Sequence, residues 1–150
     1  MYRSRVSLRL GMPHTQSGGL SEQALLAVAG DLRWTDIGAA SGTPASQQLD
    51  SEGRAVYASF YFVEVADFGE RGLATFAPAD EIEIVSTLSR YGRTMLDSEH
   101  RLYHQGILPA ELPARLPPAP RVRLSNVFVC EGKGPNDLKI TSPANARIEE

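Results

Sequence analysis

The sequence is poor in the features that mark several large classes of protein. Among its 150 residues there is one cysteine, Cys130, which excludes a disulfide within the chain. No apolar run approaches the roughly 20 residues that a membrane-spanning helix needs, so no membrane association is expected. The 15 basic residues are fewer than the 18 acidic residues and form no basic stripe, so nucleic acid is not an expected partner.

Motifs for cofactors and metals are also missing. The glycines around Gly18 lack the spacing of dinucleotide-binding or phosphate-binding loops, which disfavours nicotinamide and ATP chemistry. His100 and His104 fall on one face of a regular strand but have no third ligand in the pattern, so we expect no metal. The chain begins with Met1-Tyr2-Arg3 directly before an alternating strand, so we expect no signal peptide. The single cysteine and this N-terminus predict a cytoplasmic protein. The missing motifs predict that it uses no cofactor.

The composition that is present is typical of one globular domain. Hydrophobic residues make up 42% of the chain and charged residues 22%, and a chain of this length can bury one core. We therefore expect a single domain over residues 1–150. Within it, residues 131–150 are rich in Gly, Pro and Asn and are expected to form an extended tail.

The first third of the chain predicts a strand followed by a helix. Val6, Leu8 and Leu10 alternate with polar residues, as in a half-buried strand. An apolar helical face at spacings of i, i+3, i+4 and i+7 then consists of Leu25, Val28, Ala29 and Leu32. Ser21 is suited to cap this helix, and the small and polar residues 38–53 predict a loop.

Strands are predicted over residues 55–66, 81–88, 94–104 and 121–130. Large apolar side chains occur on both faces of the first, which predicts a strand covered on both sides. One face holds Tyr57, Tyr61, Val63 and Val65, and the other holds Val56, Phe60 and Phe62. The connection 107–121 contains half of the ten prolines and can be neither a central strand nor a helix interior. The element order predicts an α+β hot-dog fold, an antiparallel sheet wrapped around one central helix, whose single copy pairs into a dimer.

One motif has the geometry of an anion site. Leu10-Gly11-Met12-Pro13-His14 is followed by Gly18-Gly19-Leu20-Ser21-Glu22, so a strand leads through a glycine pair into a helix. Unpaired backbone N–H groups and a partial positive charge at a helix N-terminus can hold an oxyanion. The segment Gly18, Gly19, Leu20 and Ser21 is thus a candidate for substrate binding, and the alternative is a tight turn that merely reverses the chain.

Several short motifs resemble a family of biosynthetic enzymes. Met12-Pro13-His14, Gly18 to Glu22 and the following Trp34 resemble its opening block. Later blocks are similar to Tyr57-Ala58-Ser59-Phe60, Leu88-Ser89-Arg90-Tyr91-Gly92, Asn136-Asp137-Leu138 and Ser142-Pro143. The family is typified by the bifunctional acyltransferase/decarboxylase of leinamycin biosynthesis.

This resemblance implies a hot-dog enzyme of polyketide biosynthesis that acts on an acyl-CoA, methylmalonyl-CoA, without a cofactor. Such an enzyme decarboxylates the malonyl-type group and transfers the product onto the phosphopantetheine thiol of an acyl carrier protein. Members of the family are double hot-dogs. The single copy in this chain is therefore expected to form a homodimer or to pair with a partner hot-dog half.

The resemblance implies that a tyrosine performs acyl transfer, and Tyr57 lies in the matching block. Tyr61 is a second candidate, because residues i and i+4 share a face of a regular strand. Both tyrosines have the alternative of filling a half-buried sheet face. His14 is a candidate acid, base or carboxylate ligand, or else an ordinary loop histidine.

Two further polar residues are substrate-binding candidates. Asn126, on an otherwise apolar strand face, can donate to a thioester or serve as a hydrogen-bonded core amide. Arg90 can bind CoA phosphate or remain an exposed surface charge.

Two other functions remain open at this level. The first is an acyl-CoA or acyl-carrier-protein thioesterase or dehydratase, which would use a carboxylate as general base. Glu22 is the carboxylate beside the glycine motif, although an exposed residue in the first turn of the helix is the more natural interpretation of it. The second is a non-catalytic hot-dog module that binds a carrier protein. A fold does not distinguish among these functions.

Overall fold

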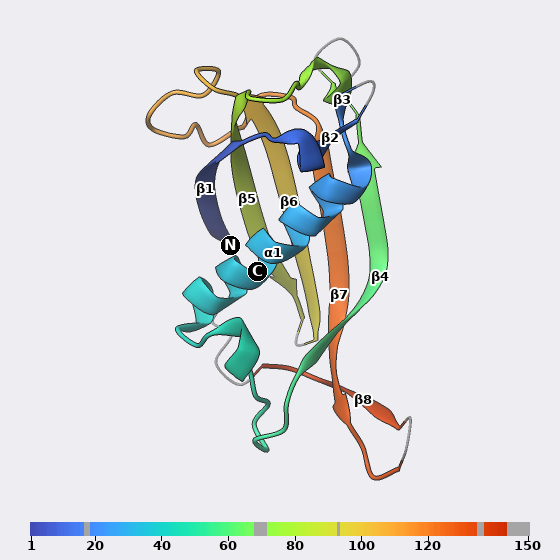
Figure 1. Ribbon diagram of the computed structural model, residues 1–150. Helices are drawn as coiled ribbons and strands as arrows, with labels where there is room; N and C mark the ends of the chain where they lie inside the picture. The colour runs from blue at the N-terminus through green and yellow to red at the C-terminus, as the bar shows by residue number, and fades with distance from the viewer. Residues whose placement is uncertain (17–18, 68–71, 93, 135–136, 144–150) are drawn as a thin grey trace.

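One long helix crosses the concave side of a curled antiparallel sheet (Figure 1). The computed structural model describes residues 1–16, 19–67, 72–92, 94–134 and 137–143. The strands are β1 (Tyr2–Arg9), β2 (Thr15–Gln16), β3 (Gly19–Leu20), β4 (Tyr57–Ala66), β5 (Glu81–Tyr91), β6 (Met95–His104), β7 (Arg121–Glu131) and β8 (Leu138–Thr141). The helix α1 spans Glu22–Ser41, and short 3₁₀ turns are η1 (Met12–His14), η2 (Ala45–Gln47) and η4 (Leu73–Thr75).

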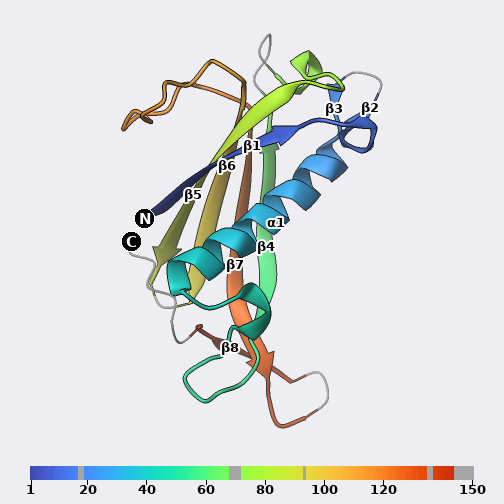
Figure 2. The ribbon, with the colours of Figure 1, turned by 60° about the vertical axis from the view of Figure 1, so that its left-hand side comes forward.

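The main sheet has the order β1-β5-β6-β7-β4, and β8 also pairs with β7. Each of these strand pairs is antiparallel. Turning the molecule shows α1 lying along the inside of the curved sheet, while the opposite face of the sheet has no helix over it among the described residues (Figure 2). This arrangement confirms the predicted sheet around one central helix. Part of the segment 131–150, which was expected to be an extended tail, forms strand β8.

The helix begins where the sequence predicts and ends later. The Ser21 hydroxyl accepts a hydrogen bond from the Ala24 N–H at 3.4 Å, as an N-cap does. The prediction of a loop from residue 38 is wrong for residues 38–41, because Ile37 and Ala40 pack into a buried cluster that extends the helix. Gly42 then ends it in a left-handed conformation with φ of 70°. Among the described helices, none is both long and apolar enough to cross a membrane.

The core between α1 and the sheet consists of two apolar clusters. The first packs Leu25 and Ala29 of α1 against Ile84, Leu102 and other sheet residues. The second surrounds Ile37 near the helix C-terminus. Burial of these side chains is the main source of stability, at about 25 cal/mol per Å² of apolar surface. The predicted apolar helix face is confirmed, and the space between its two clusters is occupied by polar side chains that are described below.

Strand β4 departs from the regular alternation that the sequence implied. The register with β7 shifts between Phe60 and Phe62, so Tyr61 is an extra residue in a β-bulge. As a result Phe60 lies over the Arg33 guanidinium on the helix side, whereas Phe62 lies over Arg123 on the outer face. The prediction that these two phenylalanines share a face is therefore wrong.

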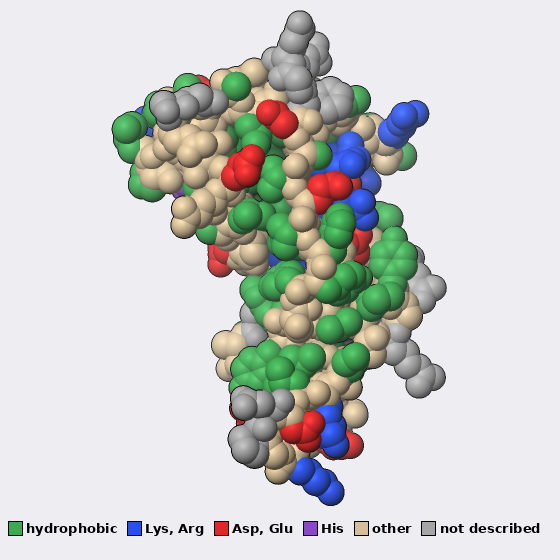
Figure 3. All heavy atoms as spheres, turned by 90° about the vertical axis from the view of Figure 1, so that its right-hand side faces the viewer, with side chains coloured by type: hydrophobic (Ala, Val, Ile, Leu, Met, Phe, Trp, Pro, Cys, Tyr) green, Lys and Arg blue, Asp and Glu red, His purple; other side chains and the backbone are tan. Residues whose placement is uncertain are grey.

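The prediction that β4 is covered on both sides is also wrong. Tyr57, Tyr61 and Val63 are 51%, 61% and 52% exposed, and β4 pairs with β7 alone among the described strands. Figure 3 shows hydrophobic side chains gathered on the side of the molecule that carries this strand. Strand β4 is therefore an exposed apolar edge of the sheet.

Candidate functional site

The structure brings together the predicted residues of the glycine motif at the N-terminus of α1. Thr15 and Gln16 pair with Leu20 and Gly19 as a two-stranded ribbon. The Ser21 N–H donates to the His14 carbonyl at 2.8 Å, which holds His14 beside the first turn of the helix. Gly18 lies outside the described residues. We call the cluster of His14, Gly19, Leu20 and Ser21 the helix-entry site.

Glycine is required at position 19. Its φ is +119°, a conformation that side chains rarely adopt. A Cβ atom there would lie 2.2 Å from the Leu73 carbonyl oxygen and 2.6 Å from Ala74 Cα. The ribbon can therefore press against the 3₁₀ turn at Leu73 only because residue 19 has no side chain.

The imidazole of His14 is held in one orientation by its own loop. The Gly11 N–H donates to Nδ1 at 2.9 Å, so Nδ1 carries a lone pair. A neutral histidine then bears its proton on Nε2. His14 is half-buried, and its Nε2–H is the donor that it can offer to a bound molecule.

The helix terminus adds further donors in the same place. The Ser21 hydroxyl satisfies the N–H of Ala24, and the Ser21 carbonyl accepts from Leu25 at 2.9 Å. The amides of Glu22 and Gln23 have no acceptor one turn earlier within the helix. Together with the helix dipole, they favour negative charge at this end. The Glu22 side chain is exposed and begins the helix.

The space enclosed beside His14 in this chain is small. A gap of about 10 Å³ lies between His14, Leu20 and Ala24, with apolar residues of α1 and the sheet around it. That volume is comparable to a single water molecule. Among the described residues, this gap is therefore too small to hold an acyl group beside His14.

Tyr57 and Tyr61 lie on β4 rather than in the helix-entry site. Tyr57 borders a cavity of about 430 Å³ together with Trp34 and Phe60. The Tyr61 hydroxyl is 3.6 Å from the Met95 sulfur, on the face of the sheet away from α1. The structure does not bring either tyrosine to His14 within the described chain.

Asn126 belongs to a buried polar network beneath α1 that the sequence did not reveal. Arg33 is 1% exposed and donates to the Leu124 carbonyl and the Leu96 carbonyl, each at 3.0 Å, and to the Asn126 side chain. No carboxylate among the described residues is within ion-pair distance of Arg33. Loss of water lowers the pKa of Arg33 to about 10. The placement matches the core-amide alternative for Asn126.

The network continues from Arg33 to His100. Arg33 also donates to the Ser98 hydroxyl, which is 3.1 Å from His100 Nε2. His100 Nδ1 is 2.7 Å from the Ser86 hydroxyl, so both ring nitrogens have partners. Desolvation, the larger cause, and the nearby positive charge of Arg33 together lower the pKa of His100 to about 4. His100 is therefore neutral in the folded protein near pH 7.

This burial predicts that the protein loses stability in mild acid. An unfolded histidine has a pKa near 6.5, so between about pH 6.5 and pH 4 the unfolded state binds a proton that the folded state does not. The free energy of unfolding is expected to fall by about 3 kcal/mol across that range through His100 alone. Urea denaturation at pH 7.0 and pH 4.5 measures this loss.

Two variants isolate the contribution of His100. In His100→Gln the acid-dependent loss is expected to shrink by most of that amount, whereas His104→Gln, on the same strand, keeps the full loss. An equal pH dependence in the wild type and His100→Gln would show that His100 does not carry the effect.

Arg90 lies far along β5 from the helix-entry site. Its guanidinium donates to the Ser142 hydroxyl at 3.0 Å, and the pairing of Arg90 with Leu96 places it at the β5–β6 hairpin. Within the described parts of the chain, no group of three or more His, Cys, Asp or Glu side chains is arranged to hold a metal ion.

Comparisons with known proteins identify the architecture. No protein-family model matches the chain, and no curated protein matches it in sequence. Among solved structures, the Dynemicin thioesterase has a TM-score of 0.68 at 14% identity, covering 97% of this chain and 92% of that one. The 4-hydroxybenzoyl CoA thioesterase from Pseudomonas sp. strain CBS-3 has a TM-score of 0.68 at 10% identity, covering 95% and 94%.

A third neighbour is Slr0204, a 1,4-dihydroxy-2-naphthoyl-CoA thioesterase from Synechocystis, with a TM-score of 0.63 at 11% identity and 90% coverage of both chains. At these identities the likeness establishes the fold and not the reaction. The curled antiparallel sheet around a single long helix is the hot-dog fold.

Proposed function

We propose that this chain is a thioesterase that hydrolyses acyl-CoA. The observation that carries the proposal is the fixed His14 Nε2–H beside the amides that begin α1. A thioester carbonyl placed there would receive hydrogen bonds from both, and these strengthen as its oxygen becomes an oxyanion. Two of the three thioesterases of the same fold are named for acyl-CoA substrates, which supports an acyl-CoA as the class of substrate.

The reaction needs a base as well as an oxyanion site. In our proposal the Glu22 carboxylate takes a proton from water as the water oxygen attacks the thioester carbon. The tetrahedral oxyanion is held by His14 Nε2–H and the helix amides. Its collapse breaks the C–S bond, and the departing CoA thiolate takes the proton back from Glu22. The products are a carboxylic acid and CoA, with no other reactant required.

A thiol-release assay tests this function. The purified chain is incubated with a panel of aromatic, straight-chain and malonyl-type acyl-CoA thioesters, and free CoA is followed with a thiol reagent. Cys130 is buried, so the folded protein contributes little background. Release of CoA with formation of the free acid supports hydrolysis, and the Glu22→Gln variant should lose it. Absence of release from every thioester by folded protein would refute the proposal.

The reaction implied by the motif resemblance is tested in the same assay. Methylmalonyl-CoA and a phosphopantetheinylated acyl carrier protein are added, and the products are read by mass spectrometry. A propionyl-carrier protein with release of carbon dioxide would replace hydrolysis by decarboxylation and acyl transfer, with Tyr57 as the residue to substitute. Unchanged thioester with stable binding of the carrier protein would favour a non-catalytic module.

We further propose that the chain acts as a homodimer joined along β4. An exposed edge with apolar side chains readily accepts a second strand. The C-terminal end of β4 leads to Asp67, whose carboxylate accepts the Leu73 N–H at 2.7 Å, next to Gly19. A second copy on β4 would therefore approach the helix-entry site and add a wall to it.

Val63→Lys is expected to convert the dimer into a monomer. Val63 is 52% exposed on β4, so a lysine is tolerated in the monomer but places a charge in the proposed interface. Sedimentation velocity measures the change, and acyl-CoA hydrolysis should fall with it. Ile140→Lys on β8 is the matched control, because Ile140 is 64% exposed and β7 separates its strand from β4. A wild-type monomer at all concentrations, or a dimer that both variants retain, would exclude this interface.

A further inference from the structure

A groove of about 690 Å³ lies on the outer face of the sheet, opposite α1. Its floor is formed by outward-facing side chains of β5, β6 and β7, and the proline-rich segment between β6 and β7 forms one wall. That segment is fixed to the sheet by a third apolar cluster, which includes Val85, Tyr103 and Leu108. The Tyr103 hydroxyl also donates to the Pro117 carbonyl at 2.7 Å. The groove is therefore walled by a segment that is packed in place.

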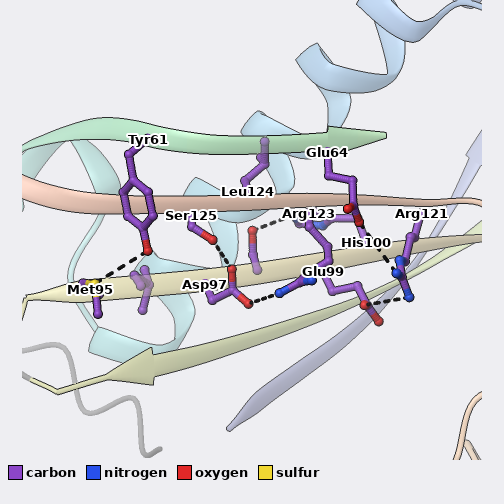
Figure 4. A network of polar contacts seen from close by, with 12 residues as sticks. Tyr61, Glu64, Met95, Asp97, Glu99, His100, Arg121, Arg123, Leu124 and Ser125 are labelled. Carbon is purple, nitrogen blue, oxygen red and sulfur yellow. Dashed lines mark hydrogen bonds and ion pairs between the residues drawn. The ribbon is translucent and has the colours of Figure 1, made fainter. Parts of the chain in front are cut away.

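The floor of the groove is a network of paired charges (Figure 4). Arg101 and Arg121 both pair with Glu99, at 2.5 Å and 3.8 Å. Arg123 pairs with Asp97 at 3.4 Å. These pairs hold the side chains in position and largely cancel one another's charge.

The walls carry positive charge that is not cancelled. Arg3 on β1 and Arg115 on the proline-rich segment line the groove, and both are exposed. Neither makes an ion pair with a described carboxylate, although Arg3 donates to the Pro113 carbonyl at 3.3 Å. Two guanidiniums at the rim of one groove suit a ligand with more than one phosphate group, since guanidinium groups bind phosphate oxygens in a forked geometry.

The rest of the groove favours a nucleotide over free phosphate. Leu116 and Pro118 give the same wall an apolar surface against which a base can lie. A volume of this size is in the range of small-molecule sites. The groove is also lined by Asp67, which binds the Leu73 N–H beside Gly19. One end of the groove thus leads over the end of β4 toward the helix-entry site.

We propose that this groove binds the phosphorylated nucleotide end of CoA, with Arg3 and Arg115 on its phosphates. The proposal rests on the proposed function, because it places the nucleotide of the same acyl-CoA that His14 would polarise. The pantetheine arm would then pass from the outer face over the end of β4 to α1. Affinity for the nucleotide is expected to weaken as salt screens the two arginines.

Direct binding separates this proposal from the reaction. Adenosine 3′,5′-bisphosphate, which has no thioester, is titrated into the full chain by calorimetry. Arg3→Gln and Arg115→Gln are each expected to raise its dissociation constant about tenfold, as loss of a charge-assisted hydrogen bond does. Arg9→Gln is the matched control, since Arg9 is an exposed arginine on β1 outside the groove. Binding that depends on Arg3 and Arg115 stands even if no thioester is hydrolysed.

Kinetics with two substrates excludes a merely structural role. For an acyl-CoA, the two groove variants should raise KM and leave kcat nearly unchanged, whereas an acyl-pantetheine without the nucleotide should be hydrolysed equally by the wild type and both variants. An equal loss on both substrates would overturn the proposal. So would binding of inorganic phosphate as tight as the bisphosphate, or arginine-dependent binding of a phosphopantetheinylated carrier protein without binding of the nucleotide.

Discussion

Gly19→Ala is expected to lower the free energy of unfolding by about 3–5 kcal/mol, from backbone strain and overpacking together. The φ of +119° is unfavourable for any residue with a Cβ atom, and that atom would lie 2.2 Å from the Leu73 carbonyl oxygen. Because the obstacle is backbone, a side-chain rotation cannot relieve it, and the ribbon must move away from Leu73. Urea denaturation at pH 7 measures the loss.

Gly30→Ala is a control in which the same glycine-to-alanine substitution should raise the free energy of unfolding and not lower it. Gly30 lies within α1, and a Cβ atom there would meet nothing within 4 Å beyond the helix's own nearby backbone. Alanine in a helix interior is more stable than glycine by about 0.5–1 kcal/mol, so this variant should gain stability. If the free energy of unfolding of Gly19→Ala is as high as that of the wild type or of Gly30→Ala, the ribbon does not press on Leu73 as the structure describes.

The order and type of the main elements were predictable because they follow local rules. Alternation of Val6 and Leu8 marks β1, and the spacing of Leu25 and Ala29 marks α1. The helix end was missed because residues 38–41 are small and have weak local preferences. Their helical state depends on the cluster around Ile37, which is a tertiary contact.

The face assignments on β4 failed for a similar reason. A strict period of two puts Phe60 and Phe62 together, but a bulge at Tyr61 turns Phe62 to the other face. Nothing in the local sequence marks this insertion. The exposure of β4 was likewise hidden, because an apolar strand covered by its own chain and one at an exposed edge have the same composition.

The buried network could have been suspected from one position. Leu25, Ala29, Arg33 and Ile37 follow one another at intervals of four, so Arg33 falls on the buried face of α1. Its partners come from β6 and β7, far along the chain, and only the folded sheet brings the Leu96 and Leu124 carbonyls to it. Such a cation without a carboxylate stays buried because neutral acceptors surround it.

The helix-entry site was predictable in place but not in chemistry. The glycine motif placed His14 and Ser21 near the start of a helix, and the structure agrees. The donor role of His14 depends on the Gly11 N–H at its Nδ1, which a sequence does not display. The prediction of His14 as an acid or base therefore becomes, in our proposal, a hydrogen-bond donor to the thioester oxygen.

His14→Asn is expected to lower kcat/KM for acyl-CoA hydrolysis by about 10²–10³-fold, the usual effect of removing one oxyanion donor. The substitution is chosen because the asparagine Oδ1 replaces Nδ1 as the acceptor for the Gly11 N–H. The loop should therefore keep its shape while the donor at Nε2 is lost. Steady-state kinetics measures the loss, and unfolding at pH 7 should remain within about 1 kcal/mol of the wild type.

His14→Gln reverses the exchange, because its terminal amide reaches the position of Nε2 as a donor but leaves the Gly11 N–H without its acceptor. It should retain more activity than His14→Asn while being the less stable of the two. That opposite ranking of activity and stability distinguishes an oxyanion donor from a residue that only shapes the loop. If His14→Asn hydrolyses acyl-CoA as fast as the wild type, or if both variants lose activity in proportion to stability, the donor role is refuted and the oxyanion must be held by the α1 amides alone.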